Sequence, residues 1–119
     1  MEFPQAVKTC LQEKYVKFSG RASRSEFWYF YLFSVILGLF ANAGMYLSQS
    51  AGLFLSSVIY LAIYLPIMEA TVRRLHDIDK SGWYILIGLI PILGWIYMIV
   101  ILSRKGTNGS NRFGEQPVT

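Results

Sequence analysis

Two long stretches without charged side chains divide the chain. Neither Phe27 to Met68 nor Ser81 to Ser103 contains Asp, Glu, Lys or Arg. A helix needs about 20 apolar residues to cross the hydrocarbon core of a bilayer, which is about 30 Å thick. The first stretch therefore has room for two crossings and the second for one. The pattern predicts an all-α membrane protein with about three hydrophobic helical segments, over residues 24–47, 51–75 and 82–102.

The first 22 residues follow a different pattern. Apolar side chains recur at helical spacing, and most polar side chains lie elsewhere on the helical wheel; the apolar set is Phe3, Val7, Leu11, Tyr15 and Phe18. This pattern predicts an N-terminal amphipathic helix within residues 1–22 that lies in the membrane interface. Ser23 with Glu26 three residues later is a capping box, which predicts that the first hydrophobic helix begins near Arg24.

The third segment, residues 82–102, has two possible courses. It contains Pro91 and Gly94 near its middle, so it is either a Pro-kinked crossing or a re-entrant hairpin. The hairpin would place all 11 Lys and Arg on one side, whereas a crossing would separate the three in the tail from the others. Each arm of a hairpin would reach only about 15 Å, and its turn would need polar partners. We therefore expect a crossing, followed by a polar, extended and solvated tail over residues 103–119.

The distribution of Lys and Arg also predicts the orientation. Basic residues precede the first hydrophobic segment and follow the second, while the link between these segments has none. The positive-inside rule then places the N-terminus and residues 69–81 in the cytoplasm, on the same side of the membrane.

The composition agrees with the prediction of a membrane protein and adds little to it. Hydrophobic residues make up 54% of the chain, and the net charge of +4 lies outside the apolar stretches. Basic residues that flank membrane helices are expected beside anionic headgroups, so this charge does not point to nucleic acid. The single Cys10 and single His76 provide neither an internal disulfide nor a zinc site of their own. We find no P-loop, dinucleotide motif or complete catalytic set, and expect no cofactor and no enzymatic activity.

The residues between the two apolar stretches are the chemically distinctive part of the chain. Glu69 precedes Arg73 by four residues, the spacing of a helical ion pair. The stretch from Asp77 to Gly82 matches the first half of a calcium loop, but the twelfth position is Gly88 and lacks the bidentate glutamate. No metal site is therefore expected.

A cationic binding site is the leading functional hypothesis. Guanidinium groups pair with phosphate oxygens, so a basic cytoplasmic face is suited to anionic phospholipid headgroups or to a partner protein. The candidate residues are Arg73, Arg74, His76, Asp77, Arg21 and Arg24.

Two alternatives remain open. The arginines can instead be topological anchors that pair with Glu26, Glu69 and Asp77. The chain can also be a subunit of an oligomeric transporter or ion relay that uses Glu69, His76 and Asp77 as titrating groups. Three short segments do not enclose a pathway, so a relay would require a homo-oligomer or another membrane protein.

Three motifs together resemble a known family. They are Phe18-Ser-Gly-Arg-Ala-Ser-Arg-Ser-Glu-Phe-Trp28, then Arg73-Arg-Leu-His-Asp77 followed by Ser81-Gly-Trp83, then Asn111-Arg-Phe-Gly114 with Pro117. The chain closely resembles, over essentially its whole length, the bacterial inner-membrane family built on the domain of unknown function 805. The resemblance implies a small multi-pass inner-membrane protein with no established reaction. The chain departs from the family at Asp79, where members often have glycine, which leaves the geometry of a turn there open.

Overall fold

The computed structural model describes residues 2–13 and 18–117, and these residues are predominantly helical. Within them, the isolated bridge between Asn111 and Gly114 is the only β-type pairing. This confirms the predicted all-α fold. The elements in chain order are α1 (Phe3–Lys8), the π-helical turn η1 (Thr9–Glu13), α2 (Arg24–Ala43), the 3₁₀ turn η2 (Gly44–Tyr46), α3 (Gln49–Asp77), the 3₁₀ helix η3 (Gly82–Leu89) and α4 (Leu93–Leu102).

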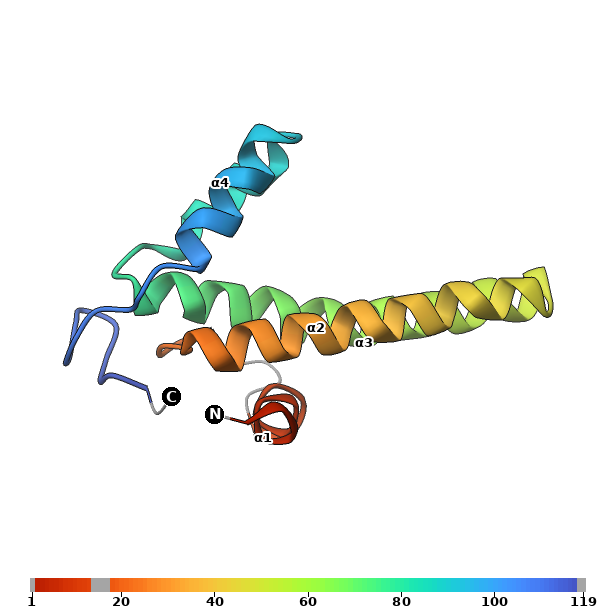
Figure 1. Ribbon diagram of the computed structural model, residues 1–119, viewed down its shortest axis with the longest axis horizontal. Coiled ribbons are helices and arrows are strands. Elements are labelled where there is room, and N and C mark those ends of the chain that lie inside the picture. The colour runs from red at the N-terminus through yellow and green to blue at the C-terminus, as the bar shows by residue number, and fades with distance from the viewer. Residues whose placement is uncertain (1, 14–17, 118–119) are drawn as a thin grey trace.

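Helices α2 and α3 form a long antiparallel pair (Figure 1). Both are long and apolar enough to cross a membrane. The charge-free part of α3, from Gln49 to Met68, is about 30 Å long, which matches the hydrocarbon core. The Ser23 hydroxyl accepts a hydrogen bond from the Glu26 backbone N–H at 3.2 Å, as the capping box predicted for that half of the motif. The helix runs from Gln49 to Asp77 and is longer than the predicted 51–75 at both ends.

The turn between α2 and α3 depends on a close backbone approach. A Cβ atom at Gly52 would lie 2.6 Å from the backbone N and Cα of Met45, which only glycine avoids. Ser48 caps the start of α3 by accepting a hydrogen bond from the Ala51 N–H at 3.3 Å. The two spans are therefore joined by a short, closely packed connection.

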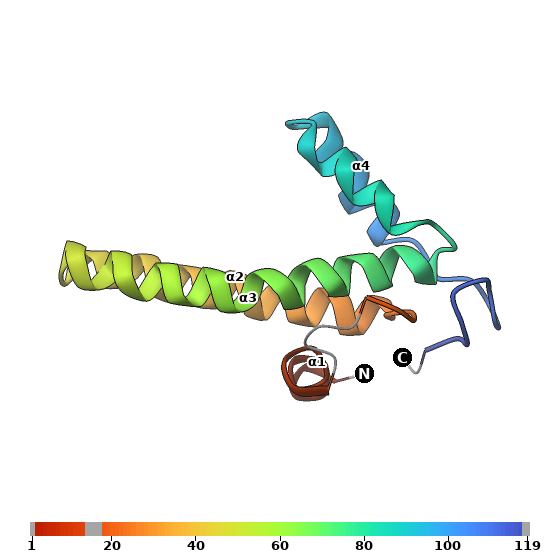
Figure 2. The same cartoon turned by 180° about the vertical axis from the view of Figure 1, so that it is seen from behind.

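The third hydrophobic segment does not cross beside the other two, and the expected crossing is wrong. Helices η3 and α4 are the two arms of a hairpin that leans away from the α2–α3 pair (Figure 2). The chain reverses at Pro91 and Ile92, where Ile92 has φ 64°. At Gly94 a Cβ atom would lie 2.0 Å from the carbonyl oxygen of Ile87, so this glycine allows the arms to approach. The hairpin returns the tail to the charged end of α3, where the tail forms the hydrogen bonds described below.

Helix α1 crosses the α2–α3 pair steeply and is seen end-on in both views (Figure 1, Figure 2). The Phe3 ring packs edge-on against Tyr29 of α2, with centroids 5.8 Å apart, and against Phe33 at 6.4 Å. The regular α-helix is shorter than the predicted pattern, because Thr9–Glu13 is a π-helical turn. Of the apolar positions used in that prediction, Tyr15 lies outside the described residues and Phe18 is exposed beyond the helix.

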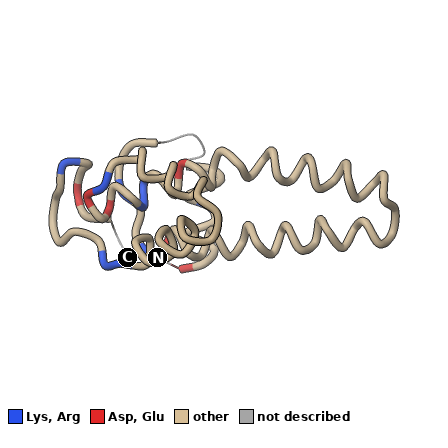
Figure 3. Tube along the Cα trace, turned by 90° about the horizontal axis from the view of Figure 1, so that it is seen from above, with Lys and Arg blue, Asp and Glu red and all other residues tan. Residues whose placement is uncertain are grey.

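Charged residues gather at one end of the molecule, and the far end of the α2–α3 pair has none (Figure 3). Large apolar side chains on this pair are exposed, including Phe40 at 70%, Phe54 at 74% and Leu61 at 76%. Apolar exposure on this scale is unusual for a soluble monomer and suits contact with lipid tails. The fold therefore separates the charge-free part of the α2–α3 pair, which we call the apolar shaft, from a charged end.

Candidate functional site

The charged end contains a buried set of three arginines and three carboxylates. None of the six residues is more than 4% exposed. Burying a charge is costly unless it is paired and hydrogen-bonded. Among the described residues, no buried side-chain nitrogen or oxygen lacks a hydrogen-bond partner. We call this set the charged junction; it consists of Arg21, Glu26, Glu69, Arg73, Arg74 and Asp77.

Arg73 joins α3 to α2. Its Nε donates to Glu69 Oε2 at 2.7 Å and its Nη2 to Glu69 Oε1 at 3.0 Å, so the guanidinium and carboxylate meet as two parallel hydrogen bonds. Its Nη1 donates to Glu26 of α2. The expected helical pair is therefore present, and Glu26 acts on Arg73 across the helix interface, not as the second half of the capping box.

Cys10 of η1 lies against this pair. Nη2 of Arg73 is 3.8 Å from its sulfur, and the side chain is fully buried. The pKa of the Cys10 thiol is raised to about 12, mainly by burial and next by the charge of Glu26, while Arg73 opposes the rise. The thiol is therefore protonated and unreactive at neutral pH.

Arg74 joins α3 to the end of α4. Its Nε donates to the carbonyl of Leu102 at 2.9 Å, and its Nη2 donates to the carbonyl of Arg104. Its Nη1 binds Asp77 Oδ2 at 2.5 Å and the Ala22 carbonyl at 3.3 Å. Asp77 thus pairs with Arg74 and Arg21.

Arg21 holds the tail against this end of the molecule. Its Nε donates to Asp77 Oδ1 at 2.9 Å, and the remaining N–H groups donate to the backbone carbonyls of Thr107, Gly109 and Gly114. The Thr107 N–H in turn donates to the Asp77 carbonyl at 2.7 Å. Most residues of the tail are exposed, but the tail is held against the molecule, because its carbonyl groups complete the hydrogen bonding of a buried arginine.

His76 lies at the edge of this network. Its Nδ1 is 2.9 Å from the carbonyl oxygen of Gly20, and its ring stacks on Phe113 of the tail with centroids 4.0 Å apart. The Asn111 side-chain amide donates to the His76 carbonyl at 2.9 Å. The turn that follows keeps a left-handed residue at Asp79, with φ 60°, which aspartate tolerates better than most residues.

The predicted site residues therefore divide into two groups. The structure brings Arg73, Arg74, Asp77 and Arg21 together, but it directs their polar groups to internal partners. Arg24 alone among the predicted cations is exposed. The two carboxylates of the relay hypothesis, Glu69 and Asp77, are each bound by guanidinium groups.

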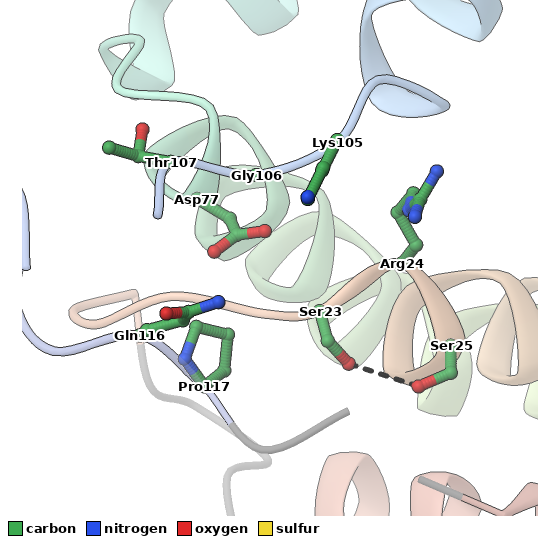
Figure 4. Close-up of a pocket in the computed structure, with 9 residues that line it drawn as sticks. All are labelled: Ser23, Arg24, Ser25, Asp77, Lys105, Gly106, Thr107, Gln116 and Pro117. Carbon is green, nitrogen blue, oxygen red and sulfur yellow. Dashed lines mark hydrogen bonds between the residues drawn. The ribbon is translucent and has the colours of Figure 1, made fainter. Parts of the chain in front are cut away.

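A cavity of about 240 Å³ lies beside the charged junction, between the first turn of α2 and the tail. Figure 4 shows Arg24 and Lys105 along one side, with the Ser23 and Ser25 hydroxyls 3.1 Å apart below them. Sequence reasoning missed Lys105 as a site residue. The only signal was its position among basic residues after the third segment, and the expected crossing placed it on the opposite side of the membrane.

Comparison with known proteins places the chain in a family. The family described as "Protein of unknown function (DUF805)" matches residues 15–115. Inner membrane protein YhaI of Escherichia coli (strain K12) is 40% identical over 105 residues, covering 88% of this chain and 89% of that protein. Inner membrane protein YhaH of the same strain is 38% identical over 109 residues, covering 88% and 90%.

No solved structure matches the chain. The three sequence motifs that suggested a resemblance meet in space. Arg21 donates hydrogen bonds to Asp77 and to the Gly114 carbonyl, and Asn111 donates to the His76 carbonyl. The family match spans most of the sequence, and both relatives are inner-membrane proteins. The chain is therefore an inner-membrane protein of the DUF805 family.

Proposed function

We propose that this protein is a non-enzymatic membrane component whose basic cytoplasmic end binds the headgroups of anionic lipids. The proposed phosphate contacts are Arg24 and Lys105 at the cavity beside the charged junction. Arg73, Arg74 and Arg21 are the scaffold that builds this end of the molecule.

One observation carries the proposal: the buried charges balance. The charged junction has equal numbers of arginines and carboxylates, so the net charge of +4 belongs to side chains outside it. Arg24 and Lys105 are exposed, and neither forms an ion pair with another described residue. These cations stand at the end of the apolar shaft, where the headgroups of a bilayer would lie.

The local geometry adds to this charge. Arg24 is the first residue of α2, a helix of 20 residues whose N-terminus carries a partial positive charge. The Ser25 hydroxyl and the Lys105 ammonium are further donors for phosphate oxygens. Each basic side chain near an anionic membrane surface contributes about 1 kcal/mol to binding.

The test compares lipid retention by the purified full chain. Native mass spectrometry would measure how much phosphatidylglycerol and phosphatidylcholine remain bound to the parent and to the Arg24→Gln/Lys105→Gln double variant. We expect the preference for phosphatidylglycerol to fall about tenfold or more in the double variant, because two cations are removed.

Arg112→Gln is the matched control. Arg112 is also exposed at the charged end, but it pairs with Asp79 at 3.3 Å and does not line the cavity. An equal loss in this control, or an unchanged preference in the double variant, would contradict the proposed site.

A further inference from the structure

A second cavity, largely apolar, lies where the η3–α4 hairpin meets the α2–α3 pair. It encloses about 310 Å³, which is at the lower end of the range for small-molecule sites. Trp28 and Tyr31 of α2 line one wall, and Trp95, Met98 and Ile99 of α4 line the other. We call it the apolar cleft.

We propose that the apolar cleft holds one acyl chain of the phospholipid whose headgroup binds at Arg24 and Lys105. The inference rests on the proposed function and deepens it, because it specifies a glycerophospholipid with an ordered chain. It differs from general contact with the bilayer, in which no particular chain position is preferred.

The lining of the apolar cleft favours hydrocarbon. Two of its polar groups are already occupied: Nε1 of Trp95 donates to the Gly88 carbonyl at 3.0 Å, and the Thr71 hydroxyl donates to the Ile67 carbonyl at 2.7 Å. The lining therefore consists mostly of ring faces and methyl groups, and its other side-chain polar groups are the Trp28 indole N–H and the Tyr31 hydroxyl. A polar ligand would lose most of its hydration there and gain few hydrogen bonds in return.

The residues that line the cleft and the headgroup site are close in sequence on both walls. Arg24 and Trp28 are four residues apart on α2 and so share one face of the helix. On the other wall Leu102 lines the cleft, and Lys105 follows it three residues later at the headgroup cavity. A molecule that binds both features must carry an anionic group directly above an apolar chain.

The length of the apolar cleft limits how much of the acyl chain it can hold. From Arg24 to Tyr31 the wall rises about 10 Å, and from Leu102 down to Trp95 the opposite wall has the same length. The cleft therefore accommodates the upper part of one acyl chain, while the remainder extends into the bilayer.

The test uses the full chain in nanodiscs that contain phosphatidylglycerol or phosphatidylcholine with a photoreactive diazirine in one acyl chain. Mass spectrometry of the digested protein would map the adducts. We expect adducts from phosphatidylglycerol to concentrate on Trp95 and Met98.

Gly88→Phe is the blocking variant. Gly88 lines the cleft, and a Cβ atom there meets nothing within 4 Å, so a larger side chain can be added without a backbone clash. We expect the adduct yield in the cleft to fall about tenfold, since the buried contacts of at least two methylene groups are lost. Val100→Phe is the matched control, because Val100 is 52% exposed on α4 and does not line the cleft.

The outcomes separate this inference from the proposed function. Two results would contradict the acyl-chain site in the apolar cleft: adducts spread over the exposed faces of α2 and α3, or cleft adducts that survive Gly88→Phe. Neither result would affect the headgroup preference measured for the proposed function. Cleft adducts that are equal for both lipids and unaffected by Arg24→Gln/Lys105→Gln would leave the chain site standing without its headgroup contact. Crosslinks to a second copy of the protein at these residues would show that the cleft is a protein interface and would also overturn the inference.

Discussion

Arg73 is buried completely, yet its guanidinium group is surrounded by partners of opposite charge. Glu69 takes two of its hydrogen bonds in parallel, and Glu26 takes a third from the neighbouring helix. A lysine ammonium is a point charge on a flexible stem and does not reproduce this planar fork. The shape of the side chain therefore contributes to stability in addition to its charge.

Substituting Arg73→Lys should lower the stability of the protein and leave its orientation unchanged. The lost charge-assisted hydrogen bonds correspond to about 1.5–3 kcal/mol, whereas the positive-inside rule counts only the charge. Thermal unfolding in detergent measures the first effect, and accessibility of an engineered cysteine measures the second. Arg112→Lys is the control, because Arg112 is 61% exposed and should show little change. Equal stability of Arg73→Lys and the parent would mean that Arg73 is only a topological anchor.

Sequence spacing predicted the pair of Glu69 and Arg73 because both lie on one helix. It did not predict that Arg74 and Arg21 would bind backbone carbonyls of the tail. Every residue has a carbonyl group, so the sequence does not show which of them will accept such a bond. The residues concerned are 30 to 93 positions apart. Local pattern therefore identified the residues of the charged junction, but it did not identify most of their partners.

Among the elements, the η3–α4 hairpin is the one for which the sequence pattern was ambiguous. Pro91 and Gly94 are compatible with a kinked crossing and with a reversal, and hydrophobicity is the same in both cases. The two spans were predictable because length and the absence of charge determine them. The course of the third segment depends on where the tail binds, which is a tertiary contact.

The hairpin should be more sensitive to an added methyl group at Gly94 than at Gly88. A Cβ atom at Gly94 would overlap the carbonyl oxygen of Ile87, whereas Gly88 has open space around it. We expect Gly94→Ala to cost about 1–3 kcal/mol through overpacking and Gly88→Ala to be near neutral. Thermal unfolding in detergent compares the two variants, and equal midpoints would show that the arms do not approach as described.

At the scale of the whole molecule, the hairpin determines the side on which the tail lies. The charged end contains the N-terminal segment, the end of α3 and the tail, so all three should face the cytoplasm together. The opposite end, at the turn between α2 and α3, should face the periplasm.

Single cysteines in a Cys10→Ser background test this arrangement. Placed at Gln5, Gln49, Lys80 and Ser110, they would be exposed to a membrane-impermeant thiol reagent in intact cells. We expect only the Gln49 position to react from outside. Labelling at Ser110 without labelling at Lys80 would show that residues 82–102 cross the membrane. Labelling at Lys80 would show that the orientation is the reverse of the predicted one. Permeabilised cells, in which all four positions should react, are the control for reagent access.

The binding of the tail to Arg21 also has a consequence for how the protein is made. Arg21 and Thr107, which form one of these hydrogen bonds, are 86 positions apart. At bacterial rates of about 5–20 residues per second, ribosomes need about 4–17 s to synthesise the chain between them. During that interval the arginine has been synthesised before its final acceptors exist. A chain that terminates before Thr107 would therefore leave the Arg21 guanidinium group without the tail carbonyl groups that bind it in the complete fold.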